Sequence, residues 1–440
     1  MPNPVEEELE AAVRDAERRF LQANPQSRAH YLRAVDVLAG GQTRHTLLHE
    51  PFPLTMKGGE GASLEDLDGH RYLDFVGDFA AGVYGHSCAT IRSEAAEAMA
   101  RGMSLGAVTE KELEFAEFIR NRIPSMQLIR FCNSGTEACL LSTLLARHAT
   151  KRDRLLVFKG AYHGGFMVYG EPQGSLNVPL DVVSCTYNDV HKTRAAIRAN
   201  ASALAAVIVE PMMGAGGCIP ATQDFLGMLR DETRSCGTLL IFDEVMTSRL
   251  SPGGLQSHYR IEPDVTTLGK FWGGGFNFGA FGGSAAIMRH FDTFGGGRLS
   301  HGGTFNNNAV TLATGLAGAR QVYSAQACVE LNERGDRLRG HLNTLGQRLN
   351  VPLQLTGLGA VMNFHWHRRP VTCPADTEAG NSLPRRLFQL EMMLAGFYVA
   401  QRGLLTLSLA HSDADLDRFA DAVEHHLRRF GSCLQRFCAA

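Results

Sequence analysis

Short apolar runs alternate with amphipathic segments through the middle of the chain, and this alternation constrains the fold more than any other feature. Continuous apolar runs bounded by polar residues are typical of strands that are buried on both faces of a parallel sheet, with crossover helices between them. The runs lie at Leu128–Cys132, Leu155–Phe158, Val182–Cys185, Ala206–Val209, Thr238–Phe242 and Val265–Leu268. We therefore predict an α/β fold with a mostly parallel central sheet and flanking helices.

Both ends of the chain depart from this alternation. Residues 5–22 have the spacing of an amphipathic helix, and residues 56–75 alternate and turn at Asp68-Gly69 as an antiparallel hairpin does. Near the other end, a capping-box-like sequence at Ser412 starts the last predicted helix. We predict a large domain over 76–325 and a smaller α+β domain built from both termini, 1–75 and 326–440.

The overall composition narrows the classes of function. The 440 residues are 44% hydrophobic and 20% charged with a net charge of −2, so neither nucleic acid nor an anionic membrane is an expected partner. The acidic start lacks the pattern of a signal peptide, and no apolar run reaches the ~18 residues that a membrane span requires. The 10 cysteines form no Cys-x-x-Cys pair, which argues against a disulfide framework and fits a reducing cytoplasm.

One His-x-His pair raises the question of a metal site. On a strand, His365 and His367 would point to the same face, as metal ligands do. No third ligand of suitable spacing stands near them, so we predict a structural role for both and no metal site.

An acid and a lysine follow two of the predicted strands. Asp243 and Glu244 end the run at Thr238–Phe242, and Lys270 follows the next run through a glycine. Ligands of open parallel sheets bind outside the carboxyl ends of the strands. Pyridoxal phosphate needs a lysine to bind its aldehyde and an acid to keep its ring nitrogen protonated, so this pair suits that cofactor. Each residue alone is more commonly a solvated charge.

Other strand ends carry polar residues that favour the same interpretation. Ser134-Gly135-Thr136 lies between a strand and a helix, where free N–H groups and hydroxyls can hold a phosphate, although an ordinary helix cap has the same composition. Tyr162 and His163 follow another strand, and the tyrosine ring could stack on a flat heterocycle. Glu210 follows Val209. Neither a Walker lysine nor a Gly-x-Gly-x-x-Gly pattern accompanies these residues.

Taken in order, these motifs resemble the class III aminotransferase family of fold-type I pyridoxal-phosphate enzymes. The resemblance rests on Asn133–Ala138, Tyr162–Gly164, Glu210-Pro211, Asp243–Val245 and Leu268–Lys270. It implies that Lys270 binds the cofactor aldehyde, that Asp243 faces the ring nitrogen, and that Tyr162 and Val245 cover the ring faces. It also implies cofactor-binding positions for Ser134, Gly135, Thr136, His163 and Glu210. Thr304, in His301–Phe305, matches a segment that reaches the phosphate of a neighbouring subunit, so a homodimer with shared active sites is expected.

Two groups within the family have motif sequences similar to those of this chain. Arg44 and Arg402 match, in context, the two carboxylate-binding arginines of aromatic β-amino acid aminotransferases. The implied reaction moves the amino group of a 3-amino-3-phenylpropanoate type of donor to 2-oxoglutarate. Phe79 is a candidate wall for the aryl group, or else a core residue.

The other group is glutamate-1-semialdehyde 2,1-aminomutase, which has a similar sequence around the positions of Asp243 and Lys270. That enzyme has a long Gly/Ser-rich gating stretch after its Tyr-His-Gly motif, whereas here only Gly165–Asn188 precedes the next recognisable point, and Ala215 replaces its Asn. Two further alternatives are a non-catalytic protein that binds pyridoxal phosphate and a protein that binds a different phosphate ligand.

Overall fold

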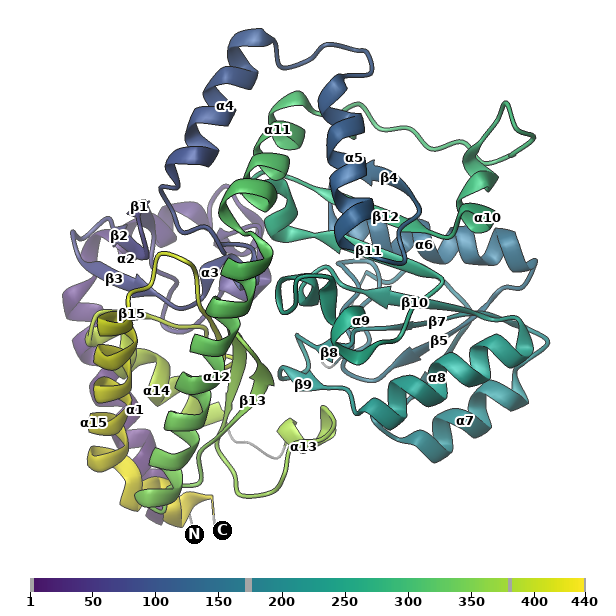
Figure 1. Cartoon of the computed structure of the whole chain (residues 1–440). Coiled ribbons are helices and arrows are strands. Elements are labelled where there is room, and N and C mark those ends of the chain that lie inside the picture. The colour runs from purple at the N-terminus through teal and green to yellow at the C-terminus, as the bar shows by residue number, and fades with distance from the viewer. Residues whose placement is uncertain (1–3, 171–175, 379–381, 439–440) are drawn as a thin grey trace.

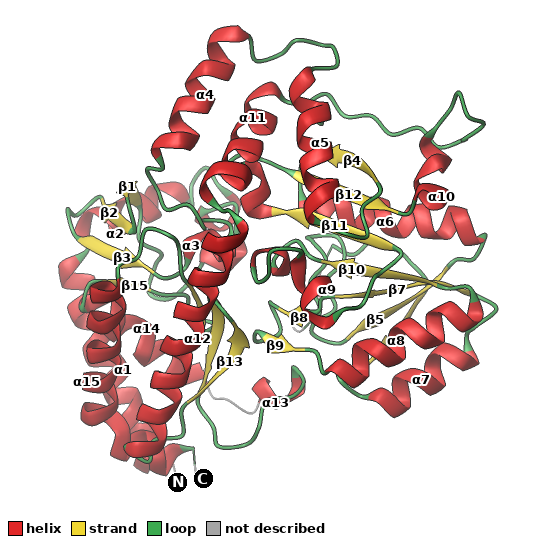
Figure 2. Ribbon diagram, in the orientation of Figure 1, coloured by secondary structure: helices red, strands yellow, loops and turns green. Residues whose placement is uncertain are grey.

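The computed structural model describes residues 4–170, 176–378 and 382–438, and these form two parts that lie side by side (Figure 1). One part contains a seven-stranded sheet, and the other contains a four-stranded and a three-stranded sheet among long helices (Figure 2). In spatial order the large sheet consists of β4 (Leu128–Cys132), β12 (Gly279–Gly283), β11 (Val265–Gly269), β10 (Leu239–Asp243), β7 (Leu204–Val209), β5 (Arg154–Phe158) and β6 (Val182–Cys185).

The direction of the strands confirms the predicted α/β fold. The pairs formed by β10, β11, β7, β5 and β6 are parallel, and only β12 runs antiparallel to its neighbours β11 and β4. β12 was not predicted, because its sequence GAFGG offers few of the branched or aromatic side chains that favour strands.

Alternate residues of the central strands pack against helices on opposite faces. In β7, Val207 and Val209 share a core with Phe225 of α8 (Gln223–Cys236), whereas Ala206 and Ile208 share another with Ala146 of α6 (Gly135–Thr150). The strand is therefore buried on both faces, which explains its unbroken apolar sequence. The other helices of this part are α4 (Ala89–Arg101), α5 (Glu110–Arg122), α7 (Val190–Ala199), α9 (Gly254–Tyr259), α10 (Ala285–Met288) and α11 (Ala309–Ala317).

The second part joins the two ends of the chain. Its four-stranded sheet contains β1 (Met56–Glu60), β2 (Ser63–Asp66), β3 (Arg71–Asp74) and β15 (Phe397–Tyr398), so a strand from the C-terminal region completes the predicted hairpin region. The three-stranded sheet contains β13 (Gln354–Leu358), β14 (Val361–His365) and β16 (Leu404–Thr406). Around them lie α1 (Pro4–Ala23), α2 (Pro25–Ala34), α12 (Ala325–Arg348), α14 (Ser382–Leu394) and α15 (Asp413–Phe437). The proposed boundaries at 75/76 and 325/326 stay a prediction.

Two local predictions are confirmed in this part. Ser412 caps α15 in a full capping box, because its hydroxyl accepts from the N–H of Asp415 and the Asp415 carboxylate accepts from the N–H of Ser412. Asp68-Gly69 lies in the turn between β2 and β3. No helix within the described ranges is long and apolar enough to cross a membrane.

The two histidines of the His-x-His pair have protein partners. His365 Nε2 lies 2.8 Å from Thr356 Oγ1 and 3.2 Å from the carbonyl oxygen of Gly217. His367 Nδ1 lies 3.3 Å from Gln354 Nε2. His365 therefore links the three-stranded sheet to a loop of the large part, which is a structural role.

A short left-handed turn, α3 (Gly77–Ala80), lies where the two parts meet. The φ angles of Gly77, Asp78, Phe79 and Ala80 are +51°, +47°, +54° and +75°. Left-handed helical backbone costs about 1–2 kcal/mol for each non-glycine residue, so the surrounding structure must hold this turn in place. No sequence pattern predicted it.

Contacts from both parts of the chain hold the turn. Thr406 Oγ1 of β16 donates to the Val76 carbonyl oxygen at 3.0 Å. The buried Arg249 of the large part donates to the carbonyl oxygen of Ala80 at 2.9 Å and to that of Leu407. The turn is therefore anchored at both of its ends.

We expect the substitution Gly77→Ala to destabilise the protein by about 2 kcal/mol, because alanine is strained at positive φ. A Cβ atom at this position would also lie 2.5 Å from Thr406 Oγ1. Urea unfolding followed by circular dichroism measures the change. The control is Gly58→Ala in β1, where an added Cβ meets no heavy atom within 4 Å. Equal stability of the two variants would show that the turn is not strained.

Candidate active site

Asp243 lies at the carboxyl end of β10 and is buried among hydrogen-bond donors. Its Oδ2 atom is 2.8 Å from His163 Nδ1 and accepts from Cys139 Sγ at 3.3 Å. Its Oδ1 atom accepts from the N–H of Val245 at 3.0 Å and from Thr267 Oγ1 at 3.2 Å. Four different segments thus converge on one carboxylate.

This surrounding keeps Asp243 ionised. Burial alone raises the pKa of its carboxyl group, but the hydrogen bond and charge of His163 and the N–H of Val245 lower it, and the net pKa lies below the ordinary value. His163 Nε2 is buried and has no hydrogen-bond partner among the described residues. An ionised acid at the floor of the site can hold a proton on a heterocyclic nitrogen above it.

Lys270 follows β11 directly, with a positive φ of 56°. Burial and the positive charge of Arg402 lower the pKa of its ammonium group, Asp243 and Asp78 act in the opposite direction, and the net value is about 8. A larger share of Lys270 is therefore the neutral amine near neutral pH than for a lysine in water.

The start of α6 combines a tightly packed glycine with two hydroxyl side chains. Ser134 is the N-cap of this 16-residue helix and its hydroxyl accepts from the N–H of Glu137 at 3.1 Å. A Cβ atom at Gly135 would lie 2.7 Å from Val245 Cγ1, so only glycine lets Val245 pack so closely over the helix start. Thr136 Oγ1 accepts from the N–H of Gly165 at 3.3 Å. Helix N–H groups and hydroxyls in this arrangement suit a phosphate.

Glu210 and Tyr162 complete the floor of the site. The Glu210 carboxylate accepts from the N–H of Tyr162 at 3.1 Å and from the N–H of Gly214 at 2.9 Å. Burial raises the pKa of Glu210 and the charge of His163 partly offsets this effect, which leaves a net value of about 7. Tyr162 remains 46% exposed, so its ring can still receive a flat partner.

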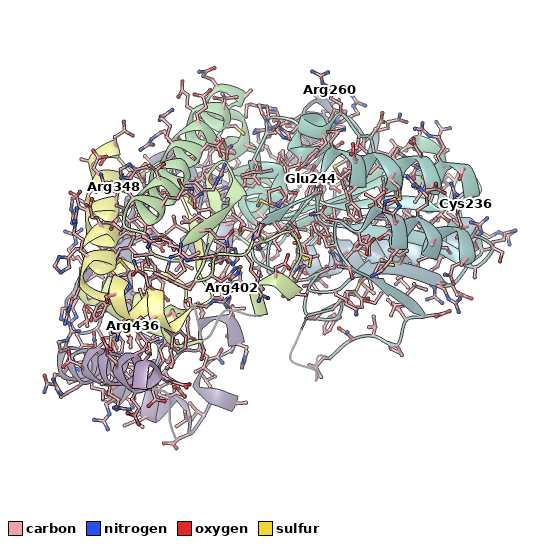
Figure 3. All side chains as sticks on the ribbon, turned by 90° about the horizontal axis from the view of Figure 1, so that it is seen from below. Cys236, Glu244, Arg260, Arg348, Arg402 and Arg436 are labelled. Carbon is pink, nitrogen blue, oxygen red and sulfur yellow. The ribbon has the colours of Figure 1, made fainter. Side chains whose placement is uncertain are left out.

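Two arginines lie near one aromatic ring. The Cζ atom of Arg402 is 4.6 Å from the centre of the Phe79 ring, and that of Arg44 is 5.5 Å from the same centre. Arg402 lies at the junction of the two parts of the chain (Figure 3). Phe79 itself is only 6% exposed, so it is a core residue whose ring also contacts both cations.

Unlike the other predicted site residues, Thr304 does not lie within the cluster described above. It is exposed in a segment that Asn306 ties to Asn133 by a 2.9 Å hydrogen bond, just before the α6 start. Residues 171–175, within the short Gly165–Asn188 stretch where the aminomutase has its gate, lie outside the described residues.

Three residues of the site were missed from the sequence. Thr267 lies opposite Asp243 in the register of β10 and β11, so its place in the strand could have identified it. Cys139 lies one turn into α6, and nothing in its sequence context signals a contact with Asp243. Asp78, adjacent to Phe79, pairs with Arg44.

Comparison with known proteins agrees with this geometry. The family described as aminotransferase class-III matches residues 47–380. The chain is a class III aminotransferase. It is 43% identical over 428 residues to the beta-phenylalanine transaminase of Variovorax paradoxus, covering 97% of this chain and 98% of that one.

Solved structures support the fold and the cofactor of this class III aminotransferase. The beta-phenylalanine aminotransferase of Variovorax paradoxus superimposes with a TM-score of 0.95 over 96% of this chain and 98% of that chain. A transaminase with PLP bound is 27% identical, with a TM-score of 0.84 over 95% of this chain and 99% of that one. A glutamate-1-semialdehyde aminomutase of Pseudomonas aeruginosa, 24% identical with a TM-score of 0.88 over 96% of this chain and 98% of that one, shares the fold.

Pyridoxal phosphate is the cofactor of this aminotransferase, and the residues present fit it. The cofactor needs an acid for its ring nitrogen, an amine for its aldehyde and hydrogen-bond donors for its phosphate. These are supplied by the ionised Asp243, by the partly neutral Lys270 and by the start of α6 at Gly135.

The pKa of Lys270 predicts how cofactor loading depends on pH. Only the neutral amine attacks an aldehyde, so the rate at which the apoenzyme binds pyridoxal phosphate should rise with pH and level off above about 8, instead of following the ordinary value of 10.5. Stopped-flow absorbance measures the rate, with N-acetyl-lysine amide as the reference amine. A rate that still rises at about pH 10, as it does for the reference, would contradict the lowered pKa.

Proposed function

We propose that this class III aminotransferase moves the amino group of an aromatic β-amino acid, of the 3-amino-3-phenylpropanoate type, to 2-oxoglutarate. The observation that carries the proposal is the pair of guanidinium groups at 4.6 Å and 5.5 Å from the centre of the Phe79 ring. Two cations close together suit both a donor with one carboxylate and an acceptor with two carboxylates. The 43% identity to a beta-phenylalanine transaminase supports the same donor.

Each residue has a distinct task in this proposal. When bound, pyridoxal phosphate supplies an aldehyde that captures the amine and a ring that withdraws electrons from the neighbouring carbon. Asp243 would keep the ring nitrogen protonated, and Ser134, Gly135 and Thr136 would hold the phosphate. Tyr162 and Val245 would enclose the ring, while His163 and Glu210 support Asp243 and Tyr162.

Lys270 carries the proton in the reaction. As a neutral amine, its Nζ atom would remove a proton from the amino-bearing carbon and return one in the second half of the cycle. Arg44 and Arg402 bind the carboxylates and so orient that carbon beside Nζ. Hydrolysis by water releases the β-keto acid, and the retained amino group is then transferred to 2-oxoglutarate by the reverse steps.

The donor and acceptor are tested with the visible spectrum of the yellow holoenzyme. Addition of 3-amino-3-phenylpropanoate should bleach the colour and 2-oxoglutarate should restore it, because each half-reaction changes the cofactor. Lys270→Ala should lower sustained turnover by about 10²–10⁴-fold, since the proton carrier is lost. A spectrum that the β-amino acid leaves unchanged would refute the proposed donor.

A second pair of variants tests the arginines. Arg402→Ala should lower kcat/KM for 2-oxoglutarate by about 10–100-fold, the effect of losing a charge-assisted pair. The matched control is Arg260→Ala, which removes an exposed arginine of the large part away from the site (Figure 3). Similar losses in both variants would mean that Arg402 does not bind the acceptor.

The aminomutase reaction is the second candidate, because the sequence around Asp243 and Lys270 is similar to that of the aminomutase. It requires no acceptor, so isomerisation of glutamate-1-semialdehyde in the absence of any oxo acid would establish it. The similarity to the Pseudomonas aeruginosa aminomutase, at 24% identity, supports the fold alone.

We also propose a homodimer that shares its active sites. A set of exposed apolar residues lies along one edge of the molecule (Figure 1). These residues belong to α4, to α5, to the segment that joins them, and to the segment between α10 and α11. The members of this set are Met99, Met103, Leu105, Val108, Leu113, Phe294 and Phe305. Phe305 is 60% exposed and adjoins Thr304, so burying this edge against a second chain would carry Thr304 to the partner.

Light scattering should give twice the chain mass of 47.9 kDa. Thr304→Ala should weaken binding of pyridoxal phosphate by about 10-fold, the effect of losing a hydrogen bond to a charged group. Co-expression of Lys270→Ala and Thr304→Ala chains decides where Thr304 acts. If Thr304 serves the partner, the mixed dimer contains one intact site with the original affinity. If Thr304 serves its own chain, the mixed dimer contains none.

A further inference from the structure

The pair formed by Arg44 and Asp78 has no role in the reaction described so far. Arg44 Nη1 donates to Asp78 Oδ1, and the two side chains are 46% and 58% exposed. In the part of the chain that the structure describes, Asp78 is the only side chain that forms a hydrogen bond with Arg44. The rest of the Arg44 fork is open to a further acceptor.

The other arginine of the site differs in this respect. Arg402 Nε is buried without a hydrogen-bond partner, and none of the described carboxylates lies within ion-pair distance of its guanidinium group. The two cations therefore stand in different states beside the same Phe79 ring. Arg44 has a resident counter-ion, and Arg402 has none.

The left-handed turn α3 creates this difference. Asp78 and Phe79 are neighbours on the turn and both contact Arg44, the first through its carboxylate and the second through its ring. The charge of Asp78 also raises the pKa of Lys270, against the effect of burial. A side chain in this position can compete with a ligand for Arg44.

Aspartate presents to Arg44 the same chemical group as the substrate does. A carboxylate that enters the site meets a guanidinium group already engaged by a carboxylate, and the exposure of the pair lets water and ligand reach it. We propose that Asp78 is the exchangeable counter-ion of Arg44, which a substrate carboxylate replaces on binding, and that Asp78 thereby determines how strongly the site prefers anionic over neutral ligands. This inference rests on the proposed function of Arg44.

The exchange has two consequences for selectivity. While Asp78 is in place, Arg44 is neutralised, so an amine without a carboxylate does not face an uncompensated charge. A carboxylate has to compete with Asp78, so its binding is weaker than to a free arginine. Removing the charge of Asp78 should therefore favour anions and disfavour neutral amines.

The test is calorimetric titration of holoenzyme with two ligands that cannot react, 3-phenylpropanoate and glutarate. Asp78→Asn should lower the Kd of both by about two- to fivefold, the range expected for an exposed ion pair. Asparagine tolerates left-handed backbone better than most residues, so the variant keeps the turn. The ratio of kcat/KM for 3-amino-3-phenylpropanoate to that for 1-phenylethylamine should rise in the same variant.

Two further variants give the outcome its meaning. Asp153→Asn removes an exposed acid that pairs with Arg147 at 2.7 Å, away from the site, and should leave both Kd values unchanged. In an Arg44→Gln background, Asp78→Asn should have no further effect, because the cation that it releases is absent. A Kd that is unchanged or higher in Asp78→Asn would overturn the proposal and assign Asp78 the task of placing Arg44.

The two ligands separate this inference from the proposed donor. If glutarate binds and 3-phenylpropanoate does not, the aromatic donor is wrong while the glutarate series still tests Asp78. If Arg44→Gln leaves both Kd values unchanged, or if neither ligand binds, Arg44 does not take carboxylates and the exchange is refuted.

Discussion

A buried, ionised carboxylate is the constraint on which the rest of the site depends. Removing Asp243 from water disfavours its charge, and His163, Cys139, Thr267 and the N–H of Val245 offset that cost by hydrogen bonding. Three of these four donors belong to other elements of the large part: α6, the loop after β5, and β11. The charge can therefore persist only where the sheet register and the helix position are already correct.

The parallel sheet explains how residues so distant in sequence come together. Because its parallel strands point the same way, the residues that follow them lie along one edge. Val207 and Val209 pack on one face of β7 and Ala206 and Ile208 on the other, and this double burial fixes the strand against rotation. The sheet is rigid, and the chemistry is placed on the segments that leave it.

The sequence predicted the strands that have a regular apolar pattern, and it did not predict the segments that lack one. Continuous apolar runs indicated the parallel strands, and Asp243 and Lys270 were found because each follows such a run. β12 was missed because its glycines carry no strand signal, and its direction depends on tertiary pairing. The turn at Gly77–Ala80 was missed because three non-glycine residues in left-handed backbone contradict local preference, and only contacts from Thr406 and Arg249 hold them there. Arg44 and Arg402 came from resemblance, since no local pattern distinguishes them from surface charges.

The position of the turn between the two parts has a mechanical consequence. Lys270 directly follows β11 of the large sheet, and Arg402 lies between β15 and β16 of the other part. Phe79 lies on a segment that contacts from both parts hold in place. The width of the proposed substrate pocket is thus set by how the two parts pack, and not by the lining side chains alone. A substitution where the two parts contact each other should therefore change the dimensions of this pocket, even when it is distant from any ligand.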